Sequence, residues 1–147
     1  MATDVTVEER IDRPRPAVAA YASDWRNDPS WITALTDVRL VTEPPFGTGS
    51  RVERVAKFLG RRIEYVNEVV AWDADERLAM RSVKAPFPMT VTYEFEDAGP
   101  GTLMRIHAEG DAGGFYRFAG PLLSLAVRRG IAKDLARLKE LLEASAA

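Results

Sequence analysis

The stretch that decides the fold is residues 51–110, RVERVAKFLGRRIEYVNEVVAWDADERLAMRSVKAPFPMTVTYEFEDAGPGTLMRIHAEG. Apolar and polar residues alternate along five runs within it, which is the pattern of strands with one buried face. The short segments between the runs are typical of turns, and Leu59–Gly60 has the length of a two-residue hairpin turn. The stretch therefore predicts an antiparallel meander with strands at residues 51–58, 61–72, 77–83, 88–96 and 102–110.

The turns fix a register that the side-chain faces can test. In every predicted hairpin the apolar residues share one face, and a slip of one residue would move them to the other face. The residues of the opposite face are mostly charged, as expected for a face in water. The predicted opposite pairs are Arg54–Tyr65, Asn67–Ser82, Val69–Met80, Met80–Val91, Leu78–Tyr93, Tyr93–Ile106 and Phe95–Met104.

The flanking sequence adds two strands and several helices. A period-two pattern predicts a strand over residues 3–11, and a further strand is expected at 38–42. Prolines predict one short helix from Pro14 to Tyr21 and a second over residues 24–29 that ends at Pro29. A short helical piece is expected at residues 115–119. A long amphipathic helix follows over residues 121–144, with the expected apolar stripe Leu122, Ala126, Ile131, Leu135, Leu138 and Leu142.

One amphipathic helix and a sheet with one apolar face bury those faces against each other. Because the sheet is wide and twisted, a single helix leaves part of its concave face uncovered, and this gap is a natural ligand cavity. Gly130 lies inside the long helix, which suggests a close approach of the sheet or a ligand. The expected architecture is one α+β domain spanning residues 1–147, with seven curved antiparallel strands around a long C-terminal helix.

Composition limits the function classes. The 147 residues carry a net charge of −2, which gives no reason to expect a nucleic-acid partner. The chain has no cysteine and one histidine, His107, so disulfides, thiol chemistry and His-rich metal centres are excluded, and no metal or cofactor is expected. Its start resembles neither a signal nor a transit peptide, and no apolar run reaches membrane-spanning length. We therefore expect a cytoplasmic location; monomer and homodimer both stay open.

Several short motifs give the chain a family resemblance. They are FLGRRIEY at residues 58–65, ERLA at 76–79, PFP at 86–88, GGF at 113–115 and DLARLK at 134–139. With the element order, they make the whole chain resemble bacterial members of the START-like superfamily, in the polyketide cyclase/dehydrase-like branch. The resemblance implies a helix-grip fold with a hydrophobic cavity between the sheet and the last helix. It implies no single activity, since the superfamily includes aromatase/cyclases, lipid and hormone carriers, and adaptors.

The polar candidates for a ligand site centre on Arg54, which faces inward between apolar neighbours. A buried arginine needs a partner or a ligand. Tyr65, Asn67 and Ser82 are predicted beside it, so the four residues form a polar patch that orients a ligand carbonyl, carboxylate or phenol. The alternative is that Arg54 extends to the rim and pairs with an acidic neighbour. Glu9 also falls on the inward face as a partner for Arg54 or a general base, unless the strand end leaves it in water.

The other candidates are apolar or aromatic. Trp31 is expected to line or gate the cavity, or simply to cap the core. His107 is predicted on the outward face, away from any catalytic role. The remaining residues expected to contact a ligand are Met80, Met89, Val91, Tyr93, Phe115, Leu122 and Ala126.

Three functions are compatible with these residues. The first is binding of a small hydrophobic molecule such as a lipid, a polyketide-like aromatic or an isoprenoid. The second is a cyclase or dehydrase in which Arg54, Tyr65 and Asn67 polarise a carbonyl group. The third is a protein–protein adaptor. A carrier needs only apolar walls and one or two polar anchors, and the sequence fits that pattern best.

Overall fold

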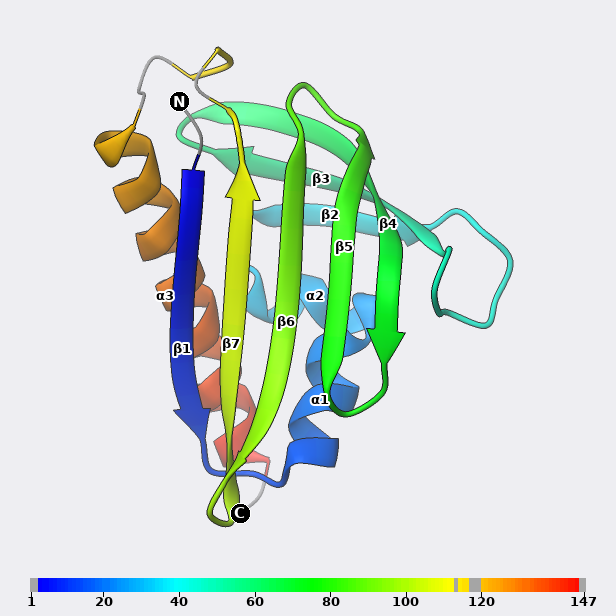
Figure 1. Ribbon diagram of the computed structural model, residues 1–147, viewed down its shortest axis with the longest axis vertical. Coiled ribbons are helices and arrows are strands. Elements are labelled where there is room, and N and C mark those ends of the chain that lie inside the picture. The colour runs from blue at the N-terminus through cyan, green and yellow to red at the C-terminus, as the bar shows by residue number, and fades with distance from the viewer. Residues whose placement is uncertain (1–2, 113, 117–119, 146–147) are drawn as a thin grey trace.

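The computed structural model describes residues 3–112, 114–116 and 120–145 (Figure 1). The described chain forms a seven-stranded antiparallel sheet with its helices on one side. The elements are β1 (Thr3–Ile11), α1 (Arg15–Ser23), the 3-10 helix η1 (Trp25–Asn27), α2 (Asp28–Trp31), β2 (Leu35–Leu40), β3 (Arg51–Phe58), β4 (Arg61–Asp73), β5 (Arg77–Lys84), β6 (Met89–Ala98), β7 (Gly101–Gly110) and α3 (Pro121–Ala144).

The strand order is β1-β7-β6-β5-β4-β3-β2, so the predicted meander is flanked by β1 at one edge and β2 at the other. The predicted register is confirmed throughout, including the pairs of Arg54 with Tyr65 and Asn67 with Ser82. The turn positions fix this register, and alternation supports it because each hairpin keeps its apolar residues on the face toward α3.

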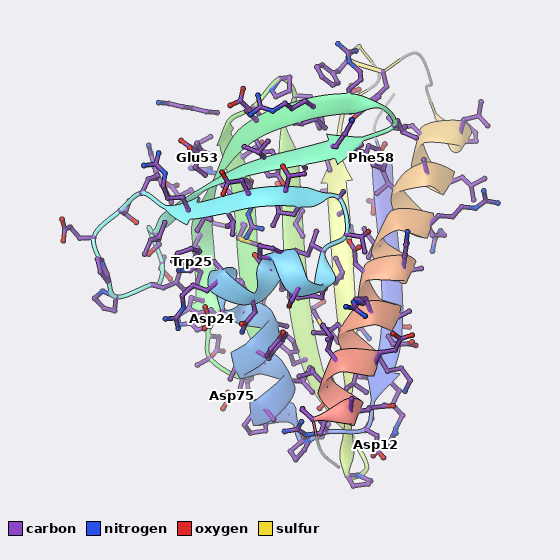
Figure 2. The ribbon with its side chains drawn as sticks, turned by 180° about the vertical axis from the view of Figure 1, so that it is seen from behind. Asp12, Asp24, Trp25, Glu53, Phe58 and Asp75 are labelled. Atoms are coloured by element: carbon purple, nitrogen blue, oxygen red, sulfur yellow. The ribbon has the colours of Figure 1, made fainter. Side chains whose placement is uncertain are left out.

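The sheet curls because β4 is long and irregular. Its pairing with β5 shifts register between Val66 and Asn67 and again between Val69 and Ala71. Such bulges bend a strand and increase its twist. In the resulting half-barrel, α3 lies along the β1 side of the concave face, and α1 and α2 lie on the same face, as the view from behind shows (Figure 2).

The turn between β3 and β4 is the predicted two-residue hairpin. Leu59 and Gly60 both have positive φ, at 51° and 79°. Positive φ at both central residues defines the type I′ turn, whose twist matches that of the flanking strands. Glycine adopts this conformation freely, whereas leucine does so at an energetic cost.

The buried face of α3 differs from the predicted one at its start. Leu122 is 62% exposed, and the buried side chains of the helix are Leu123, Leu135, Leu138 and Leu142. The first turns of α3 carry leucines at positions 122, 123 and 125, which point in different directions around the helix. The sequence therefore does not tell which of these leucines faces the sheet. The expectation that Leu122 belongs to the apolar stripe was therefore wrong, whereas Ala126 is half-buried.

Two local expectations were also inaccurate, and a third lies mostly outside the described residues. Pro29 lies in the first turn of α2, where a missing N–H costs nothing, rather than at the end of a helix. The second strand runs over Leu35–Leu40 instead of residues 38–42. At the expected helical piece 115–119, Phe115 lies in a turn and Tyr116 in a bend, and residues 117–119 lie outside the described residues.

Two hydrophobic clusters hold the layers together. The larger joins α1, α2 and the C-terminal half of α3 to the sheet, around fully buried residues such as Ile11, Met104 and Leu138. The smaller is an aromatic cluster at the other end, where Tyr116 and Leu123 pack with Phe58, Phe87 and Phe115. None of the described helices is long and apolar enough to cross a bilayer.

We predict that adjacent leucines at the start of α3 differ sharply in their effect on stability. Leu123 is 1% exposed and Leu122 is 62% exposed. Leu123→Ala should lower the free energy of unfolding by about 2–5 kcal/mol, the usual cost of an emptied leucine site. Leu122→Ala should change it by less than about 0.5 kcal/mol. Urea denaturation of the two variants measures both, and equal losses would contradict the assigned helix face.

Candidate ligand-binding site

A cavity of about 260 Å³ lies between the curved sheet and α3. It is bordered by both hydrophobic clusters, so most of its wall is apolar. The wall residues are Thr3, Trp31, Ile32, Thr33, Ala34, Arg54, Ala56, Phe58, Ile63, Tyr65, Asn67, Met80, Ser82, Ala85, Phe87, Met89, Val91, Tyr93, Ile106, Ala108, Ala112, Tyr116, Leu123, Val127, Gly130, Ile131 and Asp134.

Most of the predicted site residues belong to this wall. The structure brings together Arg54, Tyr65, Asn67, Ser82, Met80, Met89, Val91, Tyr93 and Trp31. Leu122 and Ala126 are not among the wall residues, because α3 presents Leu123 and Val127 instead. Phe115 is also outside the wall and packs behind it against Phe87 and Tyr116.

Arg54 is buried and forms an ion pair with Asp28. Its Nη2 lies 2.6 Å from Asp28 Oδ2, and the two side chains are 5% and 3% exposed. Alternation along β3 directs Arg54 inward, and the start of α2 places Asp28 opposite it. The alternative that Arg54 reaches the rim is therefore wrong, whereas its pairing with an acidic residue is confirmed; the partner is Asp28 and not Glu9. Glu9 lies half-buried on β1, paired in register with Met104.

Burial controls the ionisation of this polar group. Burial raises the pKa of Asp28 to about 6, although the nearby charge of Arg54 acts in the opposite direction. Burial also raises the pKa of Tyr65 and that of Tyr93, whose rings share the cavity with Arg54. At neutral pH the site therefore contains an ionised Asp28–Arg54 pair beside two protonated phenols.

Several polar atoms of this group are buried without a partner. Within the described part of the chain, Arg54 Nε, Trp31 Nε1 and Asp28 Oδ1 have no hydrogen bond. Arg54 Nη2 also reaches Met80 Sδ at 4.0 Å, a weak acceptor. A buried N–H left unpaired costs about 1–3 kcal/mol, so Arg54 and Trp31 carry two donors that an acceptor in the cavity would satisfy.

Asn67 and Ser82 have different roles in the wall. Asn67 is 7% exposed and borders the cavity between Arg54 and Ser82. The Ser82 hydroxyl accepts a hydrogen bond from Met89 N at 2.9 Å and so fixes the β5–β6 loop. Ser82 is thus engaged in loop structure as well as lining the cavity.

Asp134 is a wall residue that sequence reasoning missed. A charged residue on an amphipathic helix is expected to face water, but the Asp134 carboxylate accepts hydrogen bonds from Thr33 N at 2.9 Å and Thr33 Oγ1 at 3.0 Å, both on Oδ1. Burial raises the pKa of this carboxyl group, and the Thr33 bonds oppose the rise. One turn earlier, Gly130 lines the cavity. A Cβ there would lie 3.9 Å from Phe58 Cε1, an ordinary van der Waals contact, so the space around Gly130 does not by itself require glycine.

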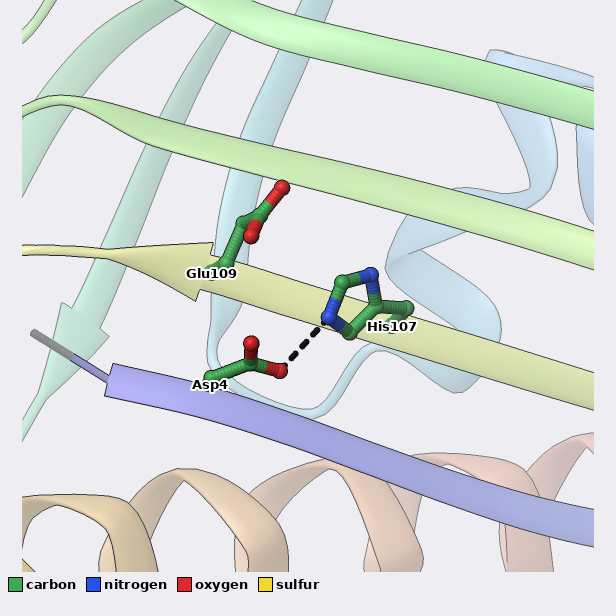
Figure 3. Close-up of side chains that lie close together, drawn as sticks. All are labelled: Asp4, His107 and Glu109. Carbon is green, nitrogen blue, oxygen red and sulfur yellow. Dashed lines mark hydrogen bonds and ion pairs between the residues drawn. The ribbon is translucent and has the colours of Figure 1, made fainter.

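The outer face of the sheet carries the only histidine. His107 Nε2 lies 2.6 Å from Asp4 Oδ1, with Glu109 beside them (Figure 3). The ligand atoms of these three residues lie within 4.8 Å of one another, a spacing compatible with a metal ion, although Asp4 and Glu109 are exposed. The hydrogen bond between His107 and Asp4 explains why these side chains lie close together. His107 lies on the outward face, as predicted.

The raised pKa of Asp28 has a consequence for stability. The unfolded chain loses this proton near pH 3.8 and the folded protein near pH 6. Between these values the folded state binds more protons, so its stability decreases as pH rises from about 4 to about 6, by up to about 3 kcal/mol from Asp28 alone.

We therefore predict that Asp28→Asn lacks the pH-dependent contribution that Asp28 makes to the free energy of unfolding. The measurement is the free energy of urea unfolding of the variant and of wild type between about pH 4 and pH 8. Asp24→Asn is the control. The hydrogen bond from Arg26 lowers the pKa of Asp24, so its contribution has the opposite sign and is lost as pH falls. Parallel curves for wild type and Asp28→Asn would show that Asp28 does not titrate in this window.

Comparisons with known proteins agree with this geometry. A family model described as polyketide cyclase / dehydrase and lipid transport matches residues 2–143. No curated protein matches the sequence.

Solved structures share the fold at low sequence identity. The aromatase/cyclase Zhui from Streptomyces sp. R1128 superposes with a TM-score of 0.82 at 15% identity, covering 100% of this chain and 97% of that one. A protein from Thermus thermophilus gives 0.82 at 21% identity, covering 98% and 99%. A START superfamily protein from Mycobacterium smegmatis gives 0.75 at 15%, covering 95% and 98%. These similarities establish the helix-grip fold, and the family match over almost the whole sequence shows that this chain belongs to the polyketide cyclase / dehydrase and lipid transport family.

Proposed function

We propose that this protein binds a compact, largely apolar molecule that carries one hydrogen-bond acceptor, such as a ketone or phenol oxygen. The proposal rests on two buried N–H donors that have no hydrogen-bond partner, Arg54 Nε and Trp31 Nε1. Both belong to residues that line an otherwise apolar cavity. A ligand acceptor would remove the cost of leaving them unpaired, and the walls would contribute about 25 cal/mol for each Å² of apolar surface that they cover.

The charge balance of the site narrows the ligand class. Asp28 already neutralises Arg54 at 2.6 Å, so above pH 6 the pair offers hydrogen bonds without net charge. A neutral carbonyl or phenol suits such a site better than a carboxylate, which would need an uncompensated cation. Polyketide-like aromatics and oxygenated isoprenoids meet this description, and the family description supports both aromatic and lipid ligands.

The predictions about location, partners, domain organisation and oligomeric state rest on the sequence alone. A cytoplasmic location, the absence of a nucleic-acid partner, the single-domain assignment and the choice between monomer and homodimer stay predictions. The adaptor hypothesis gains no support from the site, because an adaptor does not require buried donors around a cavity.

A matched pair of ligands tests the proposed anchor. For Arg54→Met we expect 2-acetylnaphthalene to bind more weakly by about 1.5–3 kcal/mol, roughly 10- to 150-fold. Its hydrocarbon counterpart 2-isopropylnaphthalene should bind equally well or better, because a polar group has left the wall. Fluorescence titration gives both dissociation constants.

Two further variants separate ligand binding from stability. Arg54→Met leaves the buried Asp28 carboxylate without its partner. The double variant Arg54→Met/Asp28→Asn keeps the site neutral and should show the same ligand preference as Arg54→Met alone. His107→Gln, on the outer face, should leave both affinities unchanged. If Arg54→Met lowers the melting temperature but leaves the ligand preference unaltered, Arg54 is only a structural ion-pair partner.

A second candidate function is proton transfer in a cyclase or dehydrase. Asp134 supports it, because its carboxyl group lies in the wall with a raised pKa and its charge is felt by Tyr65 and Tyr93. In a dehydration, Arg54 would polarise the ketone of a 3-hydroxy ketone while the Asp134 carboxylate accepts the α-proton. Asp134 would then return this proton to the departing hydroxyl group, so that water leaves and the enone forms.

This second function predicts a specific loss in Asp134→Asn. The dehydration of 3-hydroxy-1-(2-naphthyl)butan-1-one is followed by the absorbance of the enone product. Asp134→Asn should lower kcat by about 100-fold or more while the dissociation constant for 2-acetylnaphthalene stays unchanged. Thr33→Val, which removes one of the two hydrogen bonds to the carboxylate, is the control and should have a smaller effect. A wild-type rate equal to the uncatalysed rate would leave binding as the function.

A further inference from the structure

An apolar patch lies where the β3–β4 hairpin meets the start of α3. Of the five large hydrophobic side chains that are exposed among the described residues, three lie here: Leu59 at 41%, Leu122 at 62% and Leu125 at 44%. The two segments are neighbours, because the Tyr116 hydroxyl donates to Phe58 O at 3.1 Å and Leu123 packs in the same aromatic cluster. We call Leu59, Leu122 and Leu125 the leucine patch.

Leu59 is an unfavourable choice for an exposed turn in water. Its φ of 51° is the left-handed conformation, where asparagine, aspartate or glycine is preferred in a type I′ turn. Leucine there is disfavoured by conformation and exposes apolar surface as well. Contact of the hairpin tip with an apolar phase would offset both disadvantages.

The surroundings of the patch are basic. Residues 57–62 and 120–133 contain Lys57, Arg61, Arg62, Arg128, Arg129 and Lys133 and no acidic residue, although the whole chain has a net charge of −2. Arg62 is paired with Glu64 at 3.0 Å, so the basic character rests on the other five residues. On α3, Arg129 and Lys133 follow Leu125 at intervals of four residues, so they extend the same exposed side of the helix. An apolar tip with cations one to two turns behind it has the arrangement of an interfacial membrane anchor.

We propose that the leucine patch docks on the surface of an anionic lipid bilayer, with the leucines at the acyl boundary and the cations among the headgroups. The cations select the occupant, because two copies of this face would bring like charges together, whereas anionic lipid attracts them. Phe58 and Leu123, the chain neighbours of Leu59 and Leu122, line the cavity, so docking sets the ligand cavity beside the membrane. This docking goes beyond ligand binding and does not depend on it.

Vesicle co-sedimentation tests the proposal. Wild-type protein should bind phosphatidylcholine vesicles containing about 30% phosphatidylglycerol at least tenfold more tightly than pure phosphatidylcholine vesicles, and added salt should weaken the binding. The triple variant Leu59→Asn/Leu122→Ser/Leu125→Ser should lose about tenfold or more, and Leu59→Asn is compatible with the turn. Arg129→Gln/Lys133→Gln should lose binding to the anionic vesicles to a similar degree.

The control is Val41→Ser/Val70→Ser, which alters a side chain that directly follows β2 and one near the end of β4, 43% and 39% exposed, and it should bind as wild type does. Wild type that stays in the supernatant with anionic vesicles, or a triple variant that binds equally well, would overturn the proposal. So would a triple variant that converts a dimer to a monomer in sedimentation equilibrium with vesicle binding unaltered. The affinity for 2-acetylnaphthalene without vesicles is measured in parallel, so failure of docking and failure of ligand binding are distinguishable.

Discussion

The buried contact between Arg54 and Asp28 is the constraint on which the site depends. A guanidinium group cannot lie among apolar side chains without a compensating charge, and Asp28 supplies it at 2.6 Å. That requirement ties α2 to β3, next to the edge strand β2, and fixes Trp31, one turn along, against the ring of Tyr93 at a centroid distance of 5.8 Å. Breaking such a pair by removing one partner leaves a buried charge, so the contact specifies the geometry more than it adds net stability.

The same contact explains why polar chemistry is concentrated at one part of an apolar cavity. Because the ion pair uses one side of the guanidinium group, Arg54 Nε is left as a donor, and the indole N–H of Trp31 is a second. The opposite end of the cavity is closed by aromatic side chains such as Phe58, Phe87 and Tyr116. A ligand with one oxygen at one end and apolar rings or chains elsewhere matches this distribution.

How far the sequence predicts this molecule depends on the kind of signal. Period-two alternation predicts the strands, and the turns between them predict their register, so the sequence alone directs Arg54, Tyr65 and Asn67 into the cavity. The partner of Arg54 was missed because Asp28 lies in a short helical segment, where no periodicity tells which side chains point inward. Asp134 was missed because a charged residue on an amphipathic helix usually faces water, and only the contact with Thr33 brings it into the wall. The start of α3 was misoriented because consecutive leucines carry no directional information.

The most direct test of the central claim observes the two donors themselves. In a ¹H–¹⁵N spectrum, the indole signal of Trp31 is distinguished from those of Trp25 and Trp72 by comparison with Trp31→Phe, and the Nε–H signal of Arg54 by comparison with Arg54→Met. On addition of 2-acetylnaphthalene, the Trp31 and Arg54 protons should shift downfield as they bond to the ketone oxygen, while 2-isopropylnaphthalene should cause no such shift. Ketone binding that leaves both donor signals in place would contradict the account.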